Sequence, residues 1–201
     1  EQRFEALTGK RLRSGIGMTE TSPAAATQPV VLRGKLGSCG LPLPGIFIDI
    51  VARDDPHRIL ELGEAGEVRI KGPNVARGYW NRPEESAETF IDGRFLSGDI
   101  GYMDEDGYVW VVDRKKDMVI SGGVNIYPAE IEAELHKMPG VADCAIFGIP
   151  DEEYGEAICA VVQPQPDENL TEADVRGYLR GRVAGYKVPK RVDFDSHLPR
   201  E

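Results

Sequence analysis

The stretch of sequence that decides the fold is residues 97–117, SGDIGYMDEDGYVWVVDRKKD. Two runs of β-branched and aromatic residues flank Asp106-Gly107, and an Asp-Gly pair between such runs is a strong signal for a β-hairpin. If these two residues form the turn, Asp99 and Arg114 lie opposite each other, because each is seven residues from it. The sequence therefore predicts a hairpin with a carboxylate and a guanidinium at its open end.

The residues around this hairpin, 34–115, have the pattern of a β-rich subdomain. Alternating bulky and polar residues predict strands, and Pro83 followed by acidic residues predicts the first turn of a short helix. The expected strands are 46–52, 66–72, 99–103 and 108–113, and the expected helix is 83–90. Residues 1–33 lack such a pattern and are expected to be loop with fragments of helix.

After the hairpin the pattern changes to alternating helices and strands. Pro128 suits the first position of a helix, and Thr171 is a good N-cap for a second one with Val175, Leu179 and Val183 on its buried stripe. The expected helices are 127–140 and 171–183, and the expected strands are 144–150, 157–163 and 192–195. This alternation predicts a separate small α+β domain, with a boundary near Arg114–Asp117.

The composition excludes several classes of protein. A net charge of −10 over 201 residues argues against a nucleic-acid-binding protein with a broad basic face. Cys39, Cys144 and Cys159 have neither metal nor disulfide spacing, which indicates a reduced, intracellular protein. No apolar run reaches the roughly 18 residues of a membrane-spanning helix. We therefore expect a cytoplasmic protein with no integral membrane segment, with peripheral membrane association as the alternative.

Residues 14–20, SGIGMTE, have the composition of a nucleotide-facing loop. Gly15 and Gly17 would let the backbone approach a ligand closely. The hydroxyl of Thr19 could reach a phosphate oxygen, and the carboxylate of Glu20 is a hard oxygen ligand of the kind that magnesium prefers. Taken alone, an ordinary turn with two exposed polar residues is the favoured interpretation, because Gly-x-Thr-Glu is a common sequence.

Three further segments are open to two interpretations each. Asp99 could accept hydrogen bonds from two ribose hydroxyls while Arg114 donates to the same sugar, but a cross-strand ion pair explains both residues equally well. Residues 78–80, Gly-Tyr-Trp, are expected to lead from a strand into a packed aromatic pair. Residues 121–123, Ser-Gly-Gly, are expected to be an ordinary strand-to-helix connection.

The order and spacing of these segments resemble the adenylate-forming superfamily, which contains acyl-CoA synthetases, peptide-synthetase adenylation domains and firefly-type luciferases. The matching motifs are GMTET, GEVRIKGPNVARGYW, SGD, DRKKDMVISGGVNIYPAEIE and the closing LPR, in that order over residues 13–201. The resemblance implies the β-rich, barrel-like end of a large N-terminal domain (1–115, with 1–33 as a remnant), followed by a small mobile α+β domain (116–201).

The resemblance also implies roles for residues of the first motif. Ile16, Gly17 and Met18 would face ATP, Thr19 would contact its phosphates, and Glu20 would bind Mg²⁺. Ile16 departs from the family pattern, because an aromatic residue that stacks on adenine usually occupies this position.

Other implied roles fall on the later motifs. Asp99 would bind both ribose hydroxyls of ATP or AMP, and Arg114 would lie beside it. Lys116 matches the hinge about which the small domain rotates between two half-reactions. Gly122 and Gly123 match the turn that lines the pantetheine tunnel of coenzyme A. A basic cluster at residues 187–191 could meet the phosphates of coenzyme A, although a solvated surface is the favoured interpretation.

The implied activity is that of an acid–thiol ligase, which activates a carboxylic acid as its acyl-AMP and transfers the acyl group to coenzyme A. The SGGVNIYPAEIE motif looks more like ligases for fatty, aryl or malonyl-type acids than like adenylation domains that serve a carrier protein, which rank second. The family's catalytic lysine follows a Pro-Arg-x-x-x-Gly-Lys pattern, and the chain has only Pro199-Arg200-Glu201 of it. The 201 residues alone are therefore expected to be an inactive fragment.

A non-catalytic homologue that binds a nucleotide or a partner is an alternative of another class. Ile16 is the feature that favours it. The sequence beyond Glu201 distinguishes the two, because a Gly-Lys within about ten residues favours the enzyme.

Overall fold

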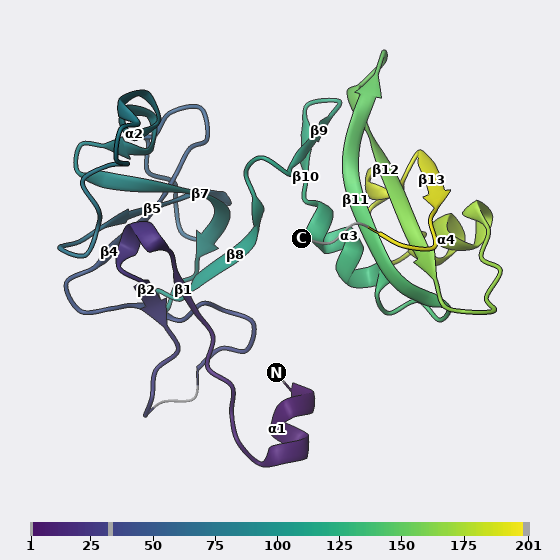
Figure 1. The fold of residues 1–201 in the computed structure, drawn as a ribbon, viewed down its shortest axis with the longest axis horizontal. Coiled ribbons are helices and arrows are strands. Elements are labelled where there is room, and N and C mark those ends of the chain that lie inside the picture. Colours follow the sequence, from purple (N-terminus) through teal and green to yellow (C-terminus); the bar gives the residue numbers. More distant parts are fainter. Residues whose placement is uncertain (1, 32–33, 199–201) are drawn as a thin grey trace. The chain divides into compact units, whose positions relative to one another are not determined.

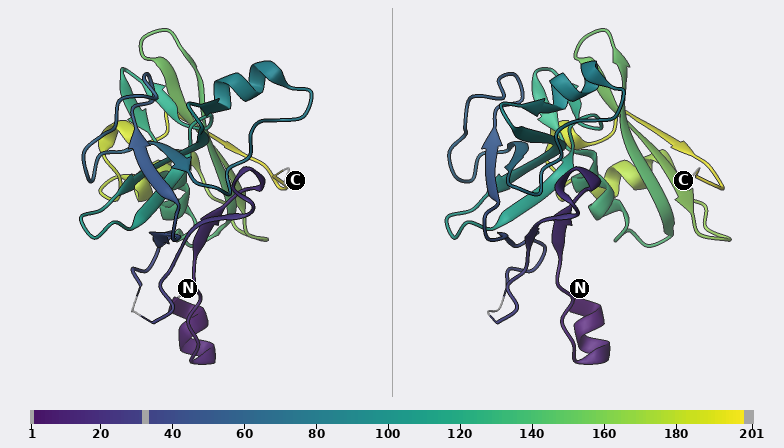
Figure 2. Two further views of the ribbon diagram at one scale, coloured as in Figure 1. Left: turned by 90° about the vertical axis from the view of Figure 1, so that its left-hand side faces the viewer. Right: turned by 60° about the vertical axis from the view of Figure 1, so that its left-hand side comes forward.

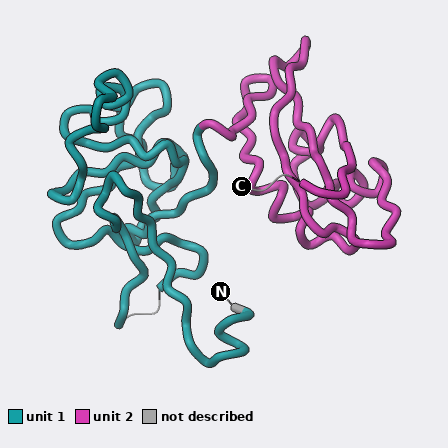
Figure 3. Tube along the Cα trace, in the orientation of Figure 1, with its two compact units in different colours: residues 1–115 teal, residues 116–201 magenta. Residues whose placement is uncertain are grey.

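The computed structural model describes residues 2–31 and 34–198. The chain divides into two compact units, Glu1–Lys115 and Lys116–Glu201 (Figure 3). Each unit has its own buried hydrophobic cluster. The fold is α+β as predicted, with a β-rich first unit and a second unit in which helices pack against a sheet. Among the described residues, no helix is both long and apolar enough to cross a lipid bilayer.

Unit 1 contains two antiparallel sheets (Figure 1). The smaller sheet has the order β1-β2-β3, and the larger has the order β4-β5-β7-β6 with β8 paired to β7. The elements are α1 (Gln2–Thr8), β1 (Gly15–Gly17), the 3₁₀ turn η1 (Thr19–Thr21), β2 (Ala24–Thr27), β3 (Leu41–Pro42), β4 (Phe47–Val51), β5 (Gly66–Lys71), α2 (Pro83–Thr89), β6 (Phe90–Ile91), β7 (Arg94–Met103) and β8 (Val109–Arg114). Helix α1 projects away from both sheets (Figure 2).

The expectation of loop over residues 1–33 was wrong for two segments. Residues 15–17 pair with residues 24–27 as antiparallel strands β1 and β2. Ala25 and Ala26 of β2 are 0% and 1% exposed and belong to the core of unit 1. Small side chains can be fully buried without producing a strong hydrophobic alternation, and this is why the sequence pattern missed the strand.

Strand β5 lies between β4 and β7 and is buried on both faces. Val68 and Ile70 are fully buried, as alternation predicts. The intervening polar residues Glu67 and Arg69 are also buried, at 4% and 6% exposure. Because a buried charge is costly without a partner, each is paired: Arg69 Nη2 lies 2.7 Å from Asp49 Oδ2, and Glu67 pairs with a lysine described below.

The predicted pairing of Asp99 with Arg114 is confirmed, although the predicted turn is wrong. Met103 pairs with Val109, so residues 104–108 form a loop longer than the two-residue turn. The register then shifts between Ile100 and Gly101, because β8 carries one extra residue there. This β-bulge offsets the one-residue shift made by the loop and restores the pairing at the open end of the hairpin.

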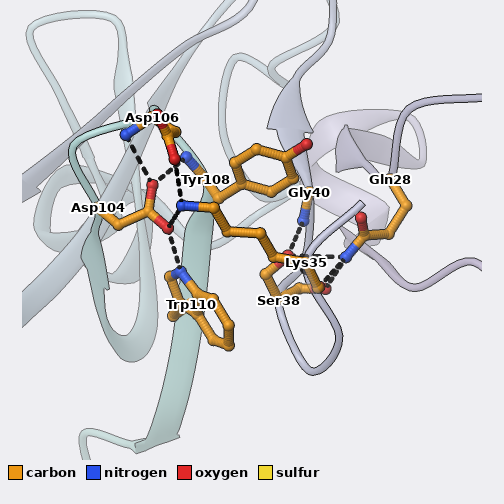
Figure 4. Close-up of polar contacts among 8 residues, drawn as sticks. All are labelled: Gln28, Lys35, Ser38, Gly40, Asp104, Asp106, Tyr108 and Trp110. Carbon is orange, nitrogen blue, oxygen red and sulfur yellow. Dashed lines mark hydrogen bonds and ion pairs between the residues drawn. The ribbon is translucent and has the colours of Figure 1, made fainter. Parts of the chain in front are cut away.

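A polar cluster around Lys35 holds the hairpin loop (Figure 4). Lys35 Nζ lies 2.7 Å from Asp104 Oδ2 and 2.6 Å from Asp106 Oδ2. Trp110 Nε1 donates to Asp104 Oδ2 at 2.9 Å, and the backbone N–H groups of Asp106 and Tyr108 donate to Oδ1 at 3.0 Å. Burial would raise the pKa of Asp104, but these donors lower it to about 2. The hydrogen bonds to Asp104 and Asp106 raise the pKa of Lys35 to about 12.

We expect Asp104→Asn to destabilise unit 1 at neutral pH. Because the pKa of Asp104 is depressed in the folded state, its ionised form stabilises the fold above about pH 4, and this contribution is lost as the pH falls towards 2. Both tryptophans, Trp80 and Trp110, lie in unit 1, so tryptophan fluorescence during urea unfolding reports on this unit. The variant should have a lower urea midpoint at pH 7, and the midpoints of the two proteins should converge as the pH falls to 2.

The matched control is Asp106→Asn. The Asp106 side chain also contacts Lys35 but is 70% exposed, so its removal should shift the midpoint less. Equal shifts for the two variants, or a difference for Asp104→Asn that does not depend on pH, would contradict this account.

Unit 2 is a sheet of order β10-β9-β12-β11, with β13 parallel to β12, covered by two helices. Its elements are β9 (Val119–Ser121), β10 (Val124–Ile126), α3 (Pro128–Leu135), β11 (Val141–Asp151), β12 (Gly155–Pro164), α4 (Glu172–Leu179), the 3₁₀ turn η2 (Gly185–Lys187) and β13 (Arg191–Phe194). Pro128 lies at the start of α3, and Thr171 caps α4 through its hydroxyl, as predicted.

Both helices are shorter than predicted. Helix α3 ends at Leu135 and α4 at Leu179. Gly181, directly after the C-cap of α4, has a φ angle of 85°, which takes the chain off the helical path. Val183 therefore lies beyond α4 and not on its stripe, although it still packs against the same core.

Candidate functional site

A cleft of about 680 Å³ in unit 1 brings together residues that the sequence analysis singled out. Met18, Thr19 and Glu20 line one part of it, and Arg114 lines another. The other lining residues are Glu67, Tyr79, Glu88, Thr89, Phe95, Leu96, Ser97, Gly98 and Lys115. The cleft is therefore built from η1, the residues before and within α2, β7 and the end of β8.

The η1 segment presents polar groups to the cleft. Thr21 is fully buried, and its hydroxyl donates to the carbonyl of Met18 at 3.1 Å. This hydrogen bond stabilises the conformation of the turn. Thr19 is exposed, so its hydroxyl is available to a ligand. The carboxylate of Glu20 accepts a hydrogen bond from the Tyr79 hydroxyl, with 2.7 Å between the hydroxyl and Oε1.

Two residues of the predicted ATP-facing segment lie outside the lining of this cleft. Ile16 and Gly17 belong to β1, and the side chain of Ile16 packs against the core of unit 1. In this position Ile16 supports the strand that leads into the Thr19–Glu20 turn.

Two pairs of opposite charge meet where the end of β8 lies beside the middle of β7 and the start of β5. Arg114 Nη1 lies 2.9 Å from Asp99 Oδ1, and Lys115 Nζ lies 2.7 Å from Glu67 Oε2. Both carboxylate side chains are buried, at 8% and 6% exposure, whereas the two cations are 57% and 41% exposed. The exposed cations are thus held by buried carboxylates and keep their outer surface free for solvent or a ligand.

The ionisation of Asp99 reflects this arrangement. Burial raises the pKa of the Asp99 carboxyl, Arg114 opposes that rise, and the negative charge of Glu67 adds to it. Lys115 neutralises Glu67 at 2.7 Å and so limits its effect on Asp99. Arg114 favours the charged form of Asp99, which can accept hydrogen bonds at both carboxylate oxygens.

The sequence analysis missed Glu67, Lys115 and Tyr79. Glu67 pairs with Ile100 in the neighbouring strand, next to Asp99, so the adjacency of β5 and β7 brings the two acids together. Residues 114–116 are three consecutive cations, and the strand before them was expected to pair with the strand that contains Asp99. This run of positive charge could have indicated contacts with acidic side chains at this end of the hairpin. The expected aromatic pair of Tyr79 with Trp80 was wrong: Tyr79 packs edge-on against Phe90 at 5.3 Å, and Trp80 is 89% exposed.

The remaining predicted residues lie in unit 2. Lys116 is exposed in the turn that follows β8. Gly122 and Gly123 have φ angles of 57° and 78° and close the β9–β10 hairpin, rather than connecting a strand directly to a helix. Gly122 borders a second hollow of about 360 Å³ within unit 2, together with Tyr154 and Tyr186.

The basic cluster of unit 2 is paired with acids. Lys187 pairs with Glu130, Lys190 with Asp151 and Arg191 with Asp193. Residues 199–201, which contain the Pro-Arg of the closing motif, lie outside the described part of the chain.

Comparison with known proteins identifies the family. The model of the AMP-binding enzymes matches residues 1–80, and the model of the AMP-binding enzyme C-terminal domain matches residues 130–201, which together are more than half of the chain. The chain belongs to the AMP-binding enzyme family.

Individual relatives support this placement. The chain is 47% identical over 186 residues to a feruloyl-CoA synthase of Amycolatopsis sp, which covers 92% of this chain and 38% of that protein. ATP-bound MatB from Rhodopseudomonas palustris superposes with a TM-score of 0.91 at 39% identity, over 100% of this chain and 40% of that one.

A second solved relative, the o-succinylbenzoate CoA synthetase MenE of Bacillus subtilis, was crystallised with its acyl-adenylate intermediate. It superposes with a TM-score of 0.87 at 33% identity, over 98% of this chain and 40% of that one. The same synthetase has been solved with ATP and magnesium, with a TM-score of 0.85 at 33% identity and the same shares of both chains. The chain thus spans about 40% of the length of the relatives that it matches.

Proposed function

We propose that this chain is the C-terminal part of an ATP-dependent ligase that activates a carboxylic acid as its acyl-AMP and transfers the acyl group to coenzyme A. The observation that carries the proposal is the cleft that Thr19, Glu20 and Arg114 line together. The buried carboxylate of Asp99 lies outside this lining and is paired with Arg114. A nucleotide needs phosphate, metal and ribose contacts, and the proposed candidates are Thr19, Glu20 and the Asp99–Arg114 pair. The relatives solved with bound ATP or with an acyl-adenylate support the same interpretation.

In the proposed reaction the residues of the cleft bind and orient ATP. Thr19 donates its hydroxyl to a phosphate oxygen, Asp99 accepts from the ribose hydroxyls, and Arg114 donates beside it. An oxygen of the substrate carboxylate attacks the α-phosphorus in line, and pyrophosphate leaves. Catalysis of this step is mainly positioning and neutralisation of phosphate charge.

Glu20 is the proposed ligand of Mg²⁺, which when bound neutralises charge on the phosphates. Magnesium is commonly held by one or two carboxylates, phosphate oxygens and water, and not by a cage of protein ligands. Over residues 2–31 and 34–198 no group of three or more His, Cys, Asp or Glu is gathered as a metal cluster. A single carboxylate in the lining of this cleft fits the magnesium site of a nucleotide–metal complex.

The second half-reaction is proposed to use unit 2. The thiol of coenzyme A attacks the activated carbonyl carbon, and AMP leaves with the electron pair of the broken acyl–phosphate bond. Gly122 and Gly123 would line the pantetheine channel, where backbone without side chains leaves room for a narrow ligand. Lys116 would be the hinge at which unit 2 reorients between the two steps.

Replacing the hinge residue should separate the two half-reactions. Lys116→Pro fixes φ near −65° and restricts the backbone rotation on which the second step depends. In the full-length protein we expect ATP–pyrophosphate exchange to stay within about threefold of the wild type, and thioester formation to fall at least roughly tenfold. Lys116→Ala, which leaves the backbone free, should retain both activities. A proportional loss of both in Lys116→Pro would contradict the hinge role.

The exposed apolar residues of the first 36 positions support a larger parent protein. Leu7, Val30 and Val31 are 77%, 75% and 93% exposed. Covering such side chains is favourable, so we propose that further parts of the protein pack against them. Much of the acid-binding pocket would lie in those parts, so the class of carboxylic acid is identified by the experiment below.

The test is ATP–pyrophosphate exchange by the full-length protein with short, medium, long-chain, aryl and dicarboxylic acids, followed by a thioester assay with coenzyme A. Exchange with one class of acid and then thioester formation would support the proposal and identify the class. Exchange without thioester would favour a carrier protein as acceptor. No exchange from folded protein would favour the non-catalytic homologue, and the proposal would be abandoned.

A further inference from the structure

We infer that Tyr79 is a positioning residue for Glu20, which it holds through one carboxylate oxygen so that the other oxygen is presented to a nucleotide-bound cation. The inference rests on the proposed function, because it assigns a role within the same site. It concerns a residue 59 positions away in sequence from the carboxylate that it contacts.

The main chain around Glu20 is hydrogen-bonded to the segment that precedes Tyr79. The backbone N–H of Ala76 donates to the carbonyl of Glu20 at 2.8 Å. The side-chain amide of Asn74 donates to the carbonyls of Thr21 and Ala24, at 2.5 and 2.9 Å. The amide therefore spans the turn that follows Glu20, and residues 74–76 fix the backbone from which its carboxylate projects.

The position of Tyr79 is itself fixed by neighbouring residues. Its ring packs edge-on against Phe90 at 5.3 Å between centroids, and Phe90 contacts the buried Phe95 at 5.4 Å. Its backbone N–H donates to Ser86 Oγ of α2 at 2.8 Å. A ring held by packing on one side and by a helix on the other gives its hydroxyl a defined position, which a positioning residue requires.

The chemistry of the contact also suits this role. A phenol hydroxyl is a hydrogen-bond donor at neutral pH, and its acceptor here is a carboxylate oxygen of Glu20. The hydrogen bond, 2.7 Å from the hydroxyl to Oε1, restricts rotation of the carboxylate. Partners of this kind commonly orient metal ligands, and their loss typically lowers metal affinity by 10- to 100-fold.

The test is Tyr79→Phe in the full-length protein, which removes the hydroxyl and keeps the ring against Phe90. The Mg²⁺ concentration for half-maximal ATP–pyrophosphate exchange should rise about tenfold, while the KM for the acid should change less than about twofold. Tyr102→Phe is the matched control, since it removes the same hydroxyl from a tyrosine whose ring stacks on Trp110, and its Mg²⁺ dependence should equal that of the wild type.

A second readout is independent of activity. In a double-mutant cycle of urea unfolding with Tyr79→Phe and Glu20→Ala, which removes the acceptor, the midpoint shift caused by Tyr79→Phe should be smaller when Glu20 is already replaced. An unchanged Mg²⁺ dependence in Tyr79→Phe, with an active wild type, would overturn the positioning role and leave the proposed function intact. Additive midpoint shifts would overturn it as well. Loss of exchange in the wild type itself would instead reject the proposed function, and the metal-positioning role with it.

Discussion

Glu20→Gln should lower the rate of acyl-adenylate formation in the full-length protein by about 100- to 1,000-fold, the usual cost of removing one transition-state contact. The substitution keeps the size of the side chain and a hydrogen-bonding partner for Tyr79, and it removes the negative charge that would bind Mg²⁺. The structure around the cleft should therefore persist while the metal is lost. The measurement is ATP–pyrophosphate exchange as a function of Mg²⁺, with the urea midpoint as a check on folding.

Glu20→Asp serves as the control for this prediction. It retains the charge but shortens the side chain, so it should recover part of the activity at high Mg²⁺, whereas Glu20→Gln should not. A Glu20→Gln variant within about threefold of the wild type would show that this carboxylate is not the metal ligand.

Asp99→Asn should raise the KM for ATP by about 10- to 100-fold, because a hydrogen bond to a charged group typically contributes about 1.5–3 kcal/mol. The carboxylate side chain is 8% exposed and paired with Arg114, so the substitution also disturbs that pair. The KM for ATP alone therefore does not separate ribose recognition from a local structural effect.

Deoxynucleotides make this separation. If Asp99 accepts hydrogen bonds from the ribose, the wild type should use 2′-deoxy-ATP and 3′-deoxy-ATP poorly compared with ATP, and Asp99→Asn should discriminate much less. A purely structural ion pair predicts equal discrimination in both proteins. The latter outcome would leave the pair in the role of a cross-strand contact that stabilises the hairpin.

Much of the fold followed from local sequence patterns. The strands near residues 46–52 and 66–72, the proline-initiated helices and the Thr171 cap were predicted because hydrophobic periodicity and capping are local properties. The Asp99–Arg114 pairing was predicted through a turn of the wrong length, and the bulge in β8 corrected it. The predicted register at the open end was therefore correct only because the bulge cancels the error in the turn length.

The contacts that were missed join residues distant in the chain. Tyr79 reaches Glu20 across 59 positions, and Lys115 reaches Glu67 across 48. No periodicity within a window of the sequence encodes such contacts, because they depend on the order of strands in the sheet. Glu67 is also buried because β5 is covered on both faces, which the alternation of bulky and polar residues did not indicate.

The central claim is that the cleft serves the formation of an acyl-adenylate. The most direct test is a rapid-quench reaction of the full-length protein with α-labelled ATP, Mg²⁺ and the acid that supports exchange, in the absence of coenzyme A. The account predicts a labelled acyl-AMP that accumulates to about one equivalent per enzyme with release of pyrophosphate, and that is converted to AMP and thioester when coenzyme A is added. Acid-dependent formation of ADP and phosphate, with no labelled adduct, would contradict it.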